Sequence, residues 1–188
     1  RTTNRHDLSL KPPRKTMLDL LKDAGRDVIA VGKIFDIFDG EGVTEKIKTT
    51  GNTNGIAFTK ALQTRDFEGL AFVNLVDFDM LYGHRRDVAG YAAAATEFDK
   101  FVADFIPGMR EGDILMVTAD HGCDPSYTKT TDHTREYVPY LICGKGVKPG
   151  VDLGTRLCFG TIAQTICDYL GVDASTLDGQ SVLGDILA

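Results

Sequence analysis

Three short acidic segments of the sequence each carry side chains that can bind a metal ion. Asp79 and His84 stand in "DFDMLYGH", Asp120 and His121 stand in "TADHG", and His133 stands in "TDHT". Carboxylate oxygens and neutral imidazole nitrogens together suit Mn²⁺, Zn²⁺ or Fe²⁺. Because three such groups occur in one chain, we predict that they meet at a centre that can hold two metal ions.

Each of these groups has a simpler interpretation when it is considered alone. An Asp-His pair after a strand is more often a cap or a loop hydrogen bond than a metal site. The repetition of the pattern at successive strand ends favours the metal site instead. Gly83 and Gly122 stand next to histidines in two of the segments, and glycine lets the backbone turn tightly enough to aim a neighbouring side chain.

Strands alternate with helices along the chain, and this alternation predicts the fold class. Apolar spacing predicts helices over residues 16–26, 55–65, 88–106 and 160–172. Apolar runs predict strands within residues 27–34, 69–80 (continuing through Val76), 112–122 and 137–144, and residues 35–55 read as a long loop. We therefore expect an α/β fold with a mostly parallel sheet flanked by helices. Ligands of such sheets bind beyond the carboxyl ends of the strands, where the acidic segments fall.

The composition excludes several classes of protein. With 188 residues, 43% of them hydrophobic, and a formal net charge of −6, the chain reads as one globular domain without the clustered Lys and Arg that nucleic-acid binding needs. The four cysteines show no C-x-x-C pairing, which indicates reduced thiols of an intracellular protein. No apolar run approaches the roughly 20 residues that span a bilayer. We expect a cytoplasmic protein with no nucleic-acid and no membrane partner.

Taken together, these motifs resemble one enzyme family. The segments "VDFDMLYGHRRD", "VTADHGCDPSYTKTTDHTREYVP", "NRHDLSLKP" and "GKIFDIFDGEGVT" are similar to those of phosphopentomutases, which belong to the alkaline phosphatase superfamily. The resemblance extends over most of the chain and implies part of an alkaline-phosphatase-like core. It implies the interconversion of (deoxy)ribose 1-phosphate and (deoxy)ribose 5-phosphate in nucleoside salvage. It also implies two Mn²⁺ ions beside a threonine that is phosphorylated during the reaction.

The resemblance also implies roles for individual residues. The metal ligands fall into two sets, which are Asp79, His84 and His133 for one ion and Asp120 and His121 for the other. Lys33 would contact the substrate phosphate, and the alternative is a surface lysine at a strand end. Asp132 or Asp77 could accept a hydrogen bond from the second nitrogen of a ligating imidazole. His6 is expected in a structural hinge.

The family's enzymes are roughly twice as long as this chain, and the nucleophile is the main feature that it lacks. No threonine stands in the matching nucleophile context, and no segment resembles the early strand that carries a further metal-binding aspartate. We expect residues 1–13 to be a connector returning from a missing cap domain, and residues 14–188 to be the C-terminal portion of the core. The missing N-terminal half would be the partner of this chain, which alone is expected to be inactive.

Two alternative functions remain open at this point. A cofactor-independent phosphoglycerate mutase, or a phosphatase of the same superfamily, would share these ligands but use a serine nucleophile. A metal-binding module without catalysis would account for the absent nucleophile.

Overall fold

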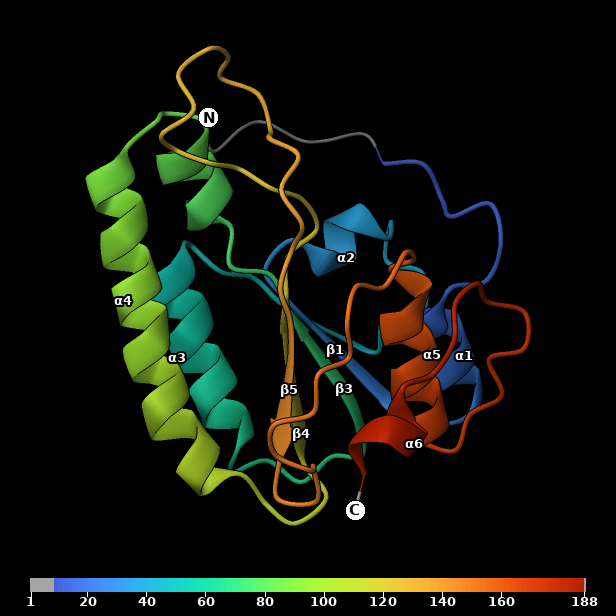
Figure 1. Ribbon diagram of the computed structural model, residues 1–188. Coiled ribbons are helices and arrows are strands. Elements are labelled where there is room, and N and C mark those ends of the chain that lie inside the picture. The colour runs from blue at the N-terminus through green and yellow to red at the C-terminus, as the bar shows by residue number, and fades with distance from the viewer. Residues whose placement is uncertain (1–8, 188) are drawn as a thin grey trace. The chain divides into compact units, whose positions relative to one another are not determined.

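A computed structural model describes residues 9–187 of the chain and divides them into two compact units (Figure 1). The first unit comprises residues 9–49, 66–74 and 151–186, and the second comprises residues 50–65, 75–150 and residue 187. His6 and most of the predicted connector lie outside the described residues. The predicted division into a connector and a core domain remains a prediction.

The first unit is built on a three-stranded parallel sheet. Its central strand β1 (Asp27–Val31) pairs with β2 (Glu45–Ile47) on one side and with β3 (Gly69–Val73) on the other. Four of the five β1 residues are buried, as expected for the apolar central strand of a parallel sheet. The helices of this unit are α1 (Met17–Asp23), α2 (Ile34–Ile37), α5 (Gly160–Tyr169) and α6 (Leu183–Ile186).

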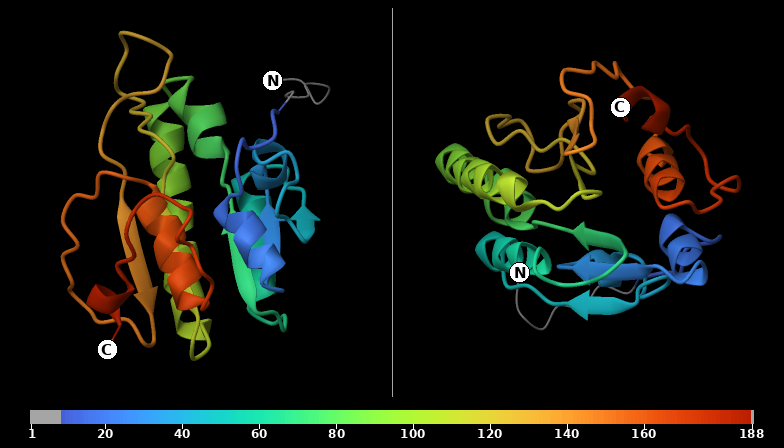
Figure 2. Two further views of the ribbon diagram at one scale, coloured as in Figure 1. Left: turned by 90° about the vertical axis from the view of Figure 1, so that its right-hand side faces the viewer. Right: turned by 90° about the horizontal axis from the view of Figure 1, so that it is seen from below.

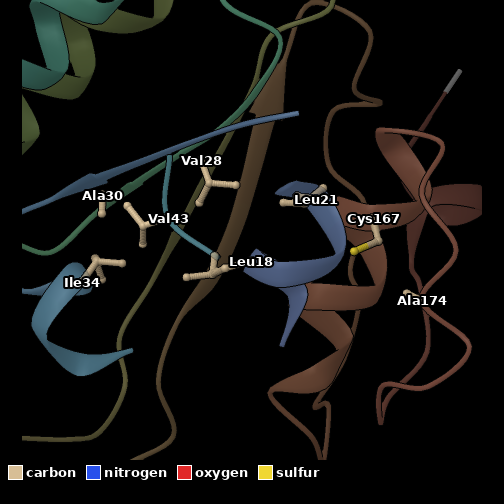
Figure 3. Packing of buried hydrophobic residues seen from close by; sticks show 8 residues of the cluster. All are labelled: Leu18, Leu21, Val28, Ala30, Ile34, Val43, Cys167 and Ala174. Carbon is tan, nitrogen blue, oxygen red and sulfur yellow. The ribbon is translucent and has the colours of Figure 1, made fainter. Parts of the chain in front are cut away.

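The core of the first unit is formed by one face of α1 together with β1 and α5. Leu18 and Leu21, three positions apart on α1, are completely buried. In Figure 3 their cluster includes Val28 of β1 and Cys167 of α5, and the views of Figure 2 place α1 and α5 side by side. Residues at this spacing share one face of a helix, so the apolar pattern of α1 dictates the face that it buries.

The second unit combines two long helices with a two-stranded sheet. α3 (Asn52–Leu62) and α4 (Val88–Phe105) lie side by side and run in the same direction (Figure 1). Thr53 near the start of α3 donates to Glu97 in the middle of α4, and Gln63 just after α3 donates to the Phe105 carbonyl at the end of α4. β4 (Ile114–Thr118) pairs antiparallel with β5 (Tyr140–Gly144). A π-helical segment, η1 (Phe78–Gly83), precedes α4, and a short 3₁₀ turn, η2 (Ile106–Gly108), follows it.

The predicted α/β class, with a parallel sheet flanked by helices, is confirmed. Two local predictions are wrong. The expected loop over residues 35–55 contains part of α2 and all of β2. The strand expected to run through Val76 ends at Val73, and the apolar residues that follow enter η1. Short apolar runs do not distinguish a strand from a helix by periodicity, which accounts for this error.

Among residues 9–187, no helix combines the length and the apolar character that a bilayer span requires.

Candidate metal centre

The predicted metal ligands come from two segments of the second unit. Asp79 lies in η1 and His84 caps its end, while Asp120, His121 and His133 lie on the long connection between β4 and β5. In Figure 1 this connection is the yellow-to-orange strand of chain that continues from β4 before returning as β5. Two polar segments far apart in the sequence therefore supply the candidate centre.

The π-helical conformation of η1 explains how two ligands five positions apart face the same centre. An α-helix turns by about 100° per residue, so side chains five positions apart point about 140° away from each other. In η1 the backbone N–H of His84 donates to the Asp79 carbonyl oxygen at 3.0 Å, which closes the wider turn of an i→i+5 bond. As a result, His84 Nε2 lies 3.3 Å from Asp79 Oδ1.

The carboxylate oxygen Oδ1 of Asp79 is the atom on which the centre converges. His84 Nε2 lies 3.3 Å from it and His133 Nε2 lies 3.4 Å from it. One potential ligand atom from each of Asp79, His121 and His133 falls within 4.8 Å of the others. The rings of His121 and His133 stack with their centroids 3.6 Å apart. The structure thus brings together one carboxylate and three imidazoles from the predicted set.

Asp79 Oδ1 is also buried and accepts no hydrogen bond from the described residues. A buried polar atom without a partner is costly, and a buried charge more so, unless a counter-charge satisfies it. The surrounding groups offer carboxylate and imidazole donors of the kind that divalent transition ions prefer. The residues present therefore fit a bound metal cation.

Hydrogen bonds to main-chain carbonyls orient two of the imidazole rings. His84 Nδ1 lies 2.6 Å from the Thr131 carbonyl oxygen, and His121 Nδ1 lies 3.1 Å from the Gly122 carbonyl oxygen. Because a carbonyl oxygen can only accept, Nδ1 of each ring must carry the proton. The neutral ring then keeps its Nε2 lone pair free to bind a cation.

The other residues predicted for the site lie in different surroundings. The Asp120 carboxylate is 77% exposed and approaches His121 Nε2 at 3.5 Å, and its assignment to a second ion remains a prediction. Lys33 belongs to the first unit, at the start of α2, and its predicted substrate contact also remains a prediction. Asp132 accepts the backbone N–H of His133 at 2.8 Å and lies 3.9 Å from its Nδ1.

Asp77 has a different role from the one predicted for it. Its carboxylate accepts the backbone N–H of Asn52 at 2.6 Å, and its own N–H donates to the Asn52 side-chain oxygen at 2.9 Å. Asn52 is buried at the first position of α3. This reciprocal pair ties the segment just before Asp79 to the start of α3, so Asp77 supports the centre through the backbone.

Close packing beside the centre explains one of the glycines. Gly83 is buried, and a Cβ atom added there would lie 2.4 Å from Cys123 Sγ. Burial raises the pKa of the Cys123 thiol above its ordinary value, and the negative charge of Asp79 adds to the rise. The thiol therefore stays protonated at neutral pH and packs as a small apolar group. A pocket of about 270 Å³, lined by His121, Cys123 and Glu136 among others, adjoins this region.

Arg86 belongs to no predicted ligand set, yet its side chain makes more hydrogen bonds than any predicted metal ligand among the described residues. Its guanidinium donates to main-chain carbonyls on both segments of the centre. The only signal in the sequence was the short basic group "HRR" at residues 84–86. Bonds to main-chain carbonyls do not depend on the side chains of the acceptor residues, so the sequence carries no pattern for them.

Comparison with known proteins agrees with this geometry. A family model described as the Metalloenzyme superfamily matches residues 1–174. The chain is 54% identical over 187 residues to a phosphopentomutase of Lachnoclostridium phytofermentans, covering 100% of this chain and 47% of that protein. Phosphopentomutases of Acetivibrio thermocellus and Desulfitobacterium hafniense are 53% and 50% identical, each over 100% of this chain and 48% of the relative.

The chain thus spans about half the length of the curated relatives that it matches. The resemblance to phosphopentomutases that the motifs indicate is confirmed over the whole chain. The match to the family model covers most of the sequence and includes every predicted ligand. The chain belongs to the Metalloenzyme superfamily.

Proposed function

We propose that this chain supplies the metal-binding part of a phosphopentomutase, which interconverts (deoxy)ribose 1-phosphate and (deoxy)ribose 5-phosphate. The observation that carries the proposal is the buried, unsatisfied Oδ1 of Asp79 with two imidazole nitrogens at 3.3 and 3.4 Å. The names of relatives at 50–54% identity support the choice of substrate. The reaction requires the part of the enzyme that lies outside the match.

The proposed cofactor is a pair of Mn²⁺ ions. Asp79, His84 and His133 would hold one ion, and Asp120 and His121 would hold the other. Bound divalent cations stabilise the charge of a phosphoryl group during transfer and make a hydroxyl nucleophile more acidic. The mixed oxygen and nitrogen donor set supports a transition ion, and borderline donors of this kind accept Mn²⁺ as well as Zn²⁺.

The protein's own residues would prepare the centre for an anionic substrate. The hydrogen bond to the Thr131 carbonyl fixes the ring of His84 in one orientation, in which the ring's Nε2 faces Asp79. The formal net charge of −6 opposes the approach of a sugar phosphate, and local positive charge would offset that field. Lys33 is proposed to bind the substrate phosphate directly.

The phosphoryl group is proposed to rest on a threonine in the part of the enzyme outside this chain. We expect the 188-residue chain to show no mutase activity alone, because it offers no threonine in the family's nucleophile context. The missing half would be its partner. The cytoplasmic location remains a prediction from the sequence.

The test joins this chain to the remaining part of the Lachnoclostridium phytofermentans phosphopentomutase and measures turnover with Mn²⁺ and a sugar-bisphosphate primer. We expect conversion of ribose 5-phosphate and deoxyribose 5-phosphate to the 1-phosphates. We expect no conversion of 3-phosphoglycerate. His84→Ala and His133→Ala should abolish both metal binding and turnover, whereas Lys100→Ala on the exposed face of α4 should change neither.

Other outcomes would select one of the alternatives. Turnover of 3-phosphoglycerate but not of pentose phosphates would favour a phosphoglycerate mutase. Metal binding without turnover of either substrate would favour a non-catalytic module. Unchanged metal affinity in both histidine variants would show that the proposed ligand set is wrong.

A further inference from the structure

Arg86 joins the two segments that carry the candidate ligands. It follows His84 by two positions, and its backbone adopts a left-handed conformation with a φ angle of 56°. All five of its side-chain N–H groups can be assigned to hydrogen bonds with four main-chain carbonyl oxygens. These are Nε to Thr130 at 2.9 Å, Nη1 to Gly83 at 3.1 Å and Asp124 at 2.8 Å, and Nη2 to Thr130 and Asp132, each at 2.5 Å.

We infer that Arg86 is a positioning residue that fixes the connection carrying His133 against the turn carrying Asp79 and His84. This inference rests on the proposed metal centre and names a residue that organises it. One of the acceptor carbonyls, that of Asp132, belongs to the residue just before His133. The intervening Thr131 carbonyl accepts from His84 itself. Residues 130–132 are therefore held by both the guanidinium and a candidate ligand.

The bonds from Arg86 also reach both ends of the stretch between His121 and His133. Asp124 lies three residues after His121, and Asp132 lies one residue before His133, so a single side chain ties down the stretch that links the two histidines. The same guanidinium bonds to Gly83, which precedes His84. Loss of this side chain would remove the donors of four main-chain carbonyls. The distances among the imidazoles would then no longer be fixed in the metal-free protein.

The side chain required at this position is specifically an arginine. A guanidinium offers five donors in a rigid planar fork, whereas a lysine ammonium offers three donors from a single point. One ammonium group cannot reach the carbonyls of Gly83, Asp124, Thr130 and Asp132 together. The left-handed backbone of Arg86 separately indicates that its surroundings hold this residue in place, because a non-glycine residue keeps this costly conformation only where it is held there.

The experiment compares Arg86→Ala and Arg86→Lys with Arg85→Ala, a matched control at the exposed neighbouring arginine. Mn²⁺ affinity is measured by calorimetric titration, and the absorption spectrum of Co²⁺-substituted protein reports the ligand geometry. Residues that orient metal ligands typically change metal affinity by about 10–100-fold when they are removed. We expect a loss of this size and an altered Co²⁺ spectrum in Arg86→Ala, partial recovery in Arg86→Lys, and no change in Arg85→Ala.

Hydrogen exchange of the metal-free protein tests the same inference without any metal. Residues 122–134 should lose protection in Arg86→Ala, including the Thr134 N–H that bonds to the Gly122 carbonyl. Circular dichroism checks that the variant folds. If Arg86→Ala does not fold, Arg86→Lys decides the question, and wild-type affinity together with wild-type protection in that variant would overturn the inference.

Asp79→Ala serves to separate failure of this inference from failure of the metal centre. Wild-type Mn²⁺ affinity in Arg86→Ala, when Asp79→Ala has lost it, would overturn the role of Arg86 alone. Wild-type affinity in Asp79→Ala would reject the metal centre instead. In that case the exchange data still judge Arg86, because unchanged protection of residues 122–134 would overturn its role as the residue that holds the connection.

Discussion

Replacing Asp79 with asparagine should shift the stability of the metal-free and the metal-loaded chain in opposite directions. In the metal-free chain the Asp79 carboxylate destabilises the folded state, because its Oδ1 is buried and receives no hydrogen bond from the described residues. Asparagine removes the negative charge while keeping the shape of the side chain. With a metal bound, the same carboxylate stabilises the folded state by binding the ion, for which the neutral amide oxygen of asparagine is a weaker ligand.

The size of both shifts follows from the environment of Asp79. An unsatisfied buried charge costs more than a neutral polar group, which remains in Asp79→Asn, and the side chain as a whole is 32% exposed, so the expected gain in the metal-free chain is about 1 kcal/mol. For a chain of this length that gain corresponds to a rise in Tm of about 2–4 °C. Metal at 100 times its Kd would stabilise the wild-type chain by about 2.7 kcal/mol, so the metal-loaded wild-type chain should be more stable than Asp79→Asn.

Thermal unfolding with EDTA and with excess Mn²⁺ measures both shifts. The experiment belongs at pH 8, where imidazoles are ordinarily neutral, so that ion pairing between histidine and carboxylate does not favour the wild-type chain. Asp99→Asn, which removes the same charge from an exposed position on α4, is the control and should respond to Mn²⁺ like the wild type. A metal-free Asp79→Asn chain that melts below the wild type, or equal responses to Mn²⁺, would refute the reasoning.

Two further substitutions test the packing and the electrostatics. Gly83→Ala should lower Tm, because a Cβ placed 2.4 Å from Cys123 Sγ overpacks the site at a cost of about 1–3 kcal/mol. The control Gly146→Ala places its Cβ more than 4 Å from any atom beyond its chain neighbours and should leave Tm unchanged. Equal Tm values for the two variants would contradict the clash. Ser175→Ala should partly raise the pKa of Asp173, which the Ser175 N–H and hydroxyl hold below its ordinary value. A depressed carboxyl pKa contributes stability that is present above the ordinary pKa and is lost as pH falls through the folded pKa. The variant should therefore lose part of this stability. An NMR titration that shows no rise in the Asp173 pKa would contradict the assignment.

The helices of this fold were predictable because their signals are local. Leu18 and Leu21 of α1 stand at helical spacing, and the run of residues that forms α4 contains few helix breakers. β2 was missed because it is three residues long, and its pairing partner Ile29 is 16 positions from Glu45. Nothing within so short a polar segment indicates a strand, and a partner strand must supply its hydrogen bonds.

For the candidate centre, the sequence indicated the ligand types but could not show which ligands meet. His121 was grouped with the adjacent Asp120, whereas the structure stacks its ring on His133, twelve positions away, and brings both near Asp79. Whether Asp120 binds a second ion remains a prediction. The path of the connection decides these neighbours, and that path depends on main-chain bonds to Arg86, which no side-chain pattern records.

The wide turn of η1 changes what a search for paired ligands in related sequences should look for. Helical metal sites are commonly sought as two donors four positions apart, since that interval aligns side chains on an ordinary helix. In this chain, Asp79 and His84 are aligned at an interval of five because the backbone between them is expanded. A substitution at Met80 or Leu81 that converts this wide turn into an ordinary α-helical turn should therefore move the two donors apart, although it changes neither of them.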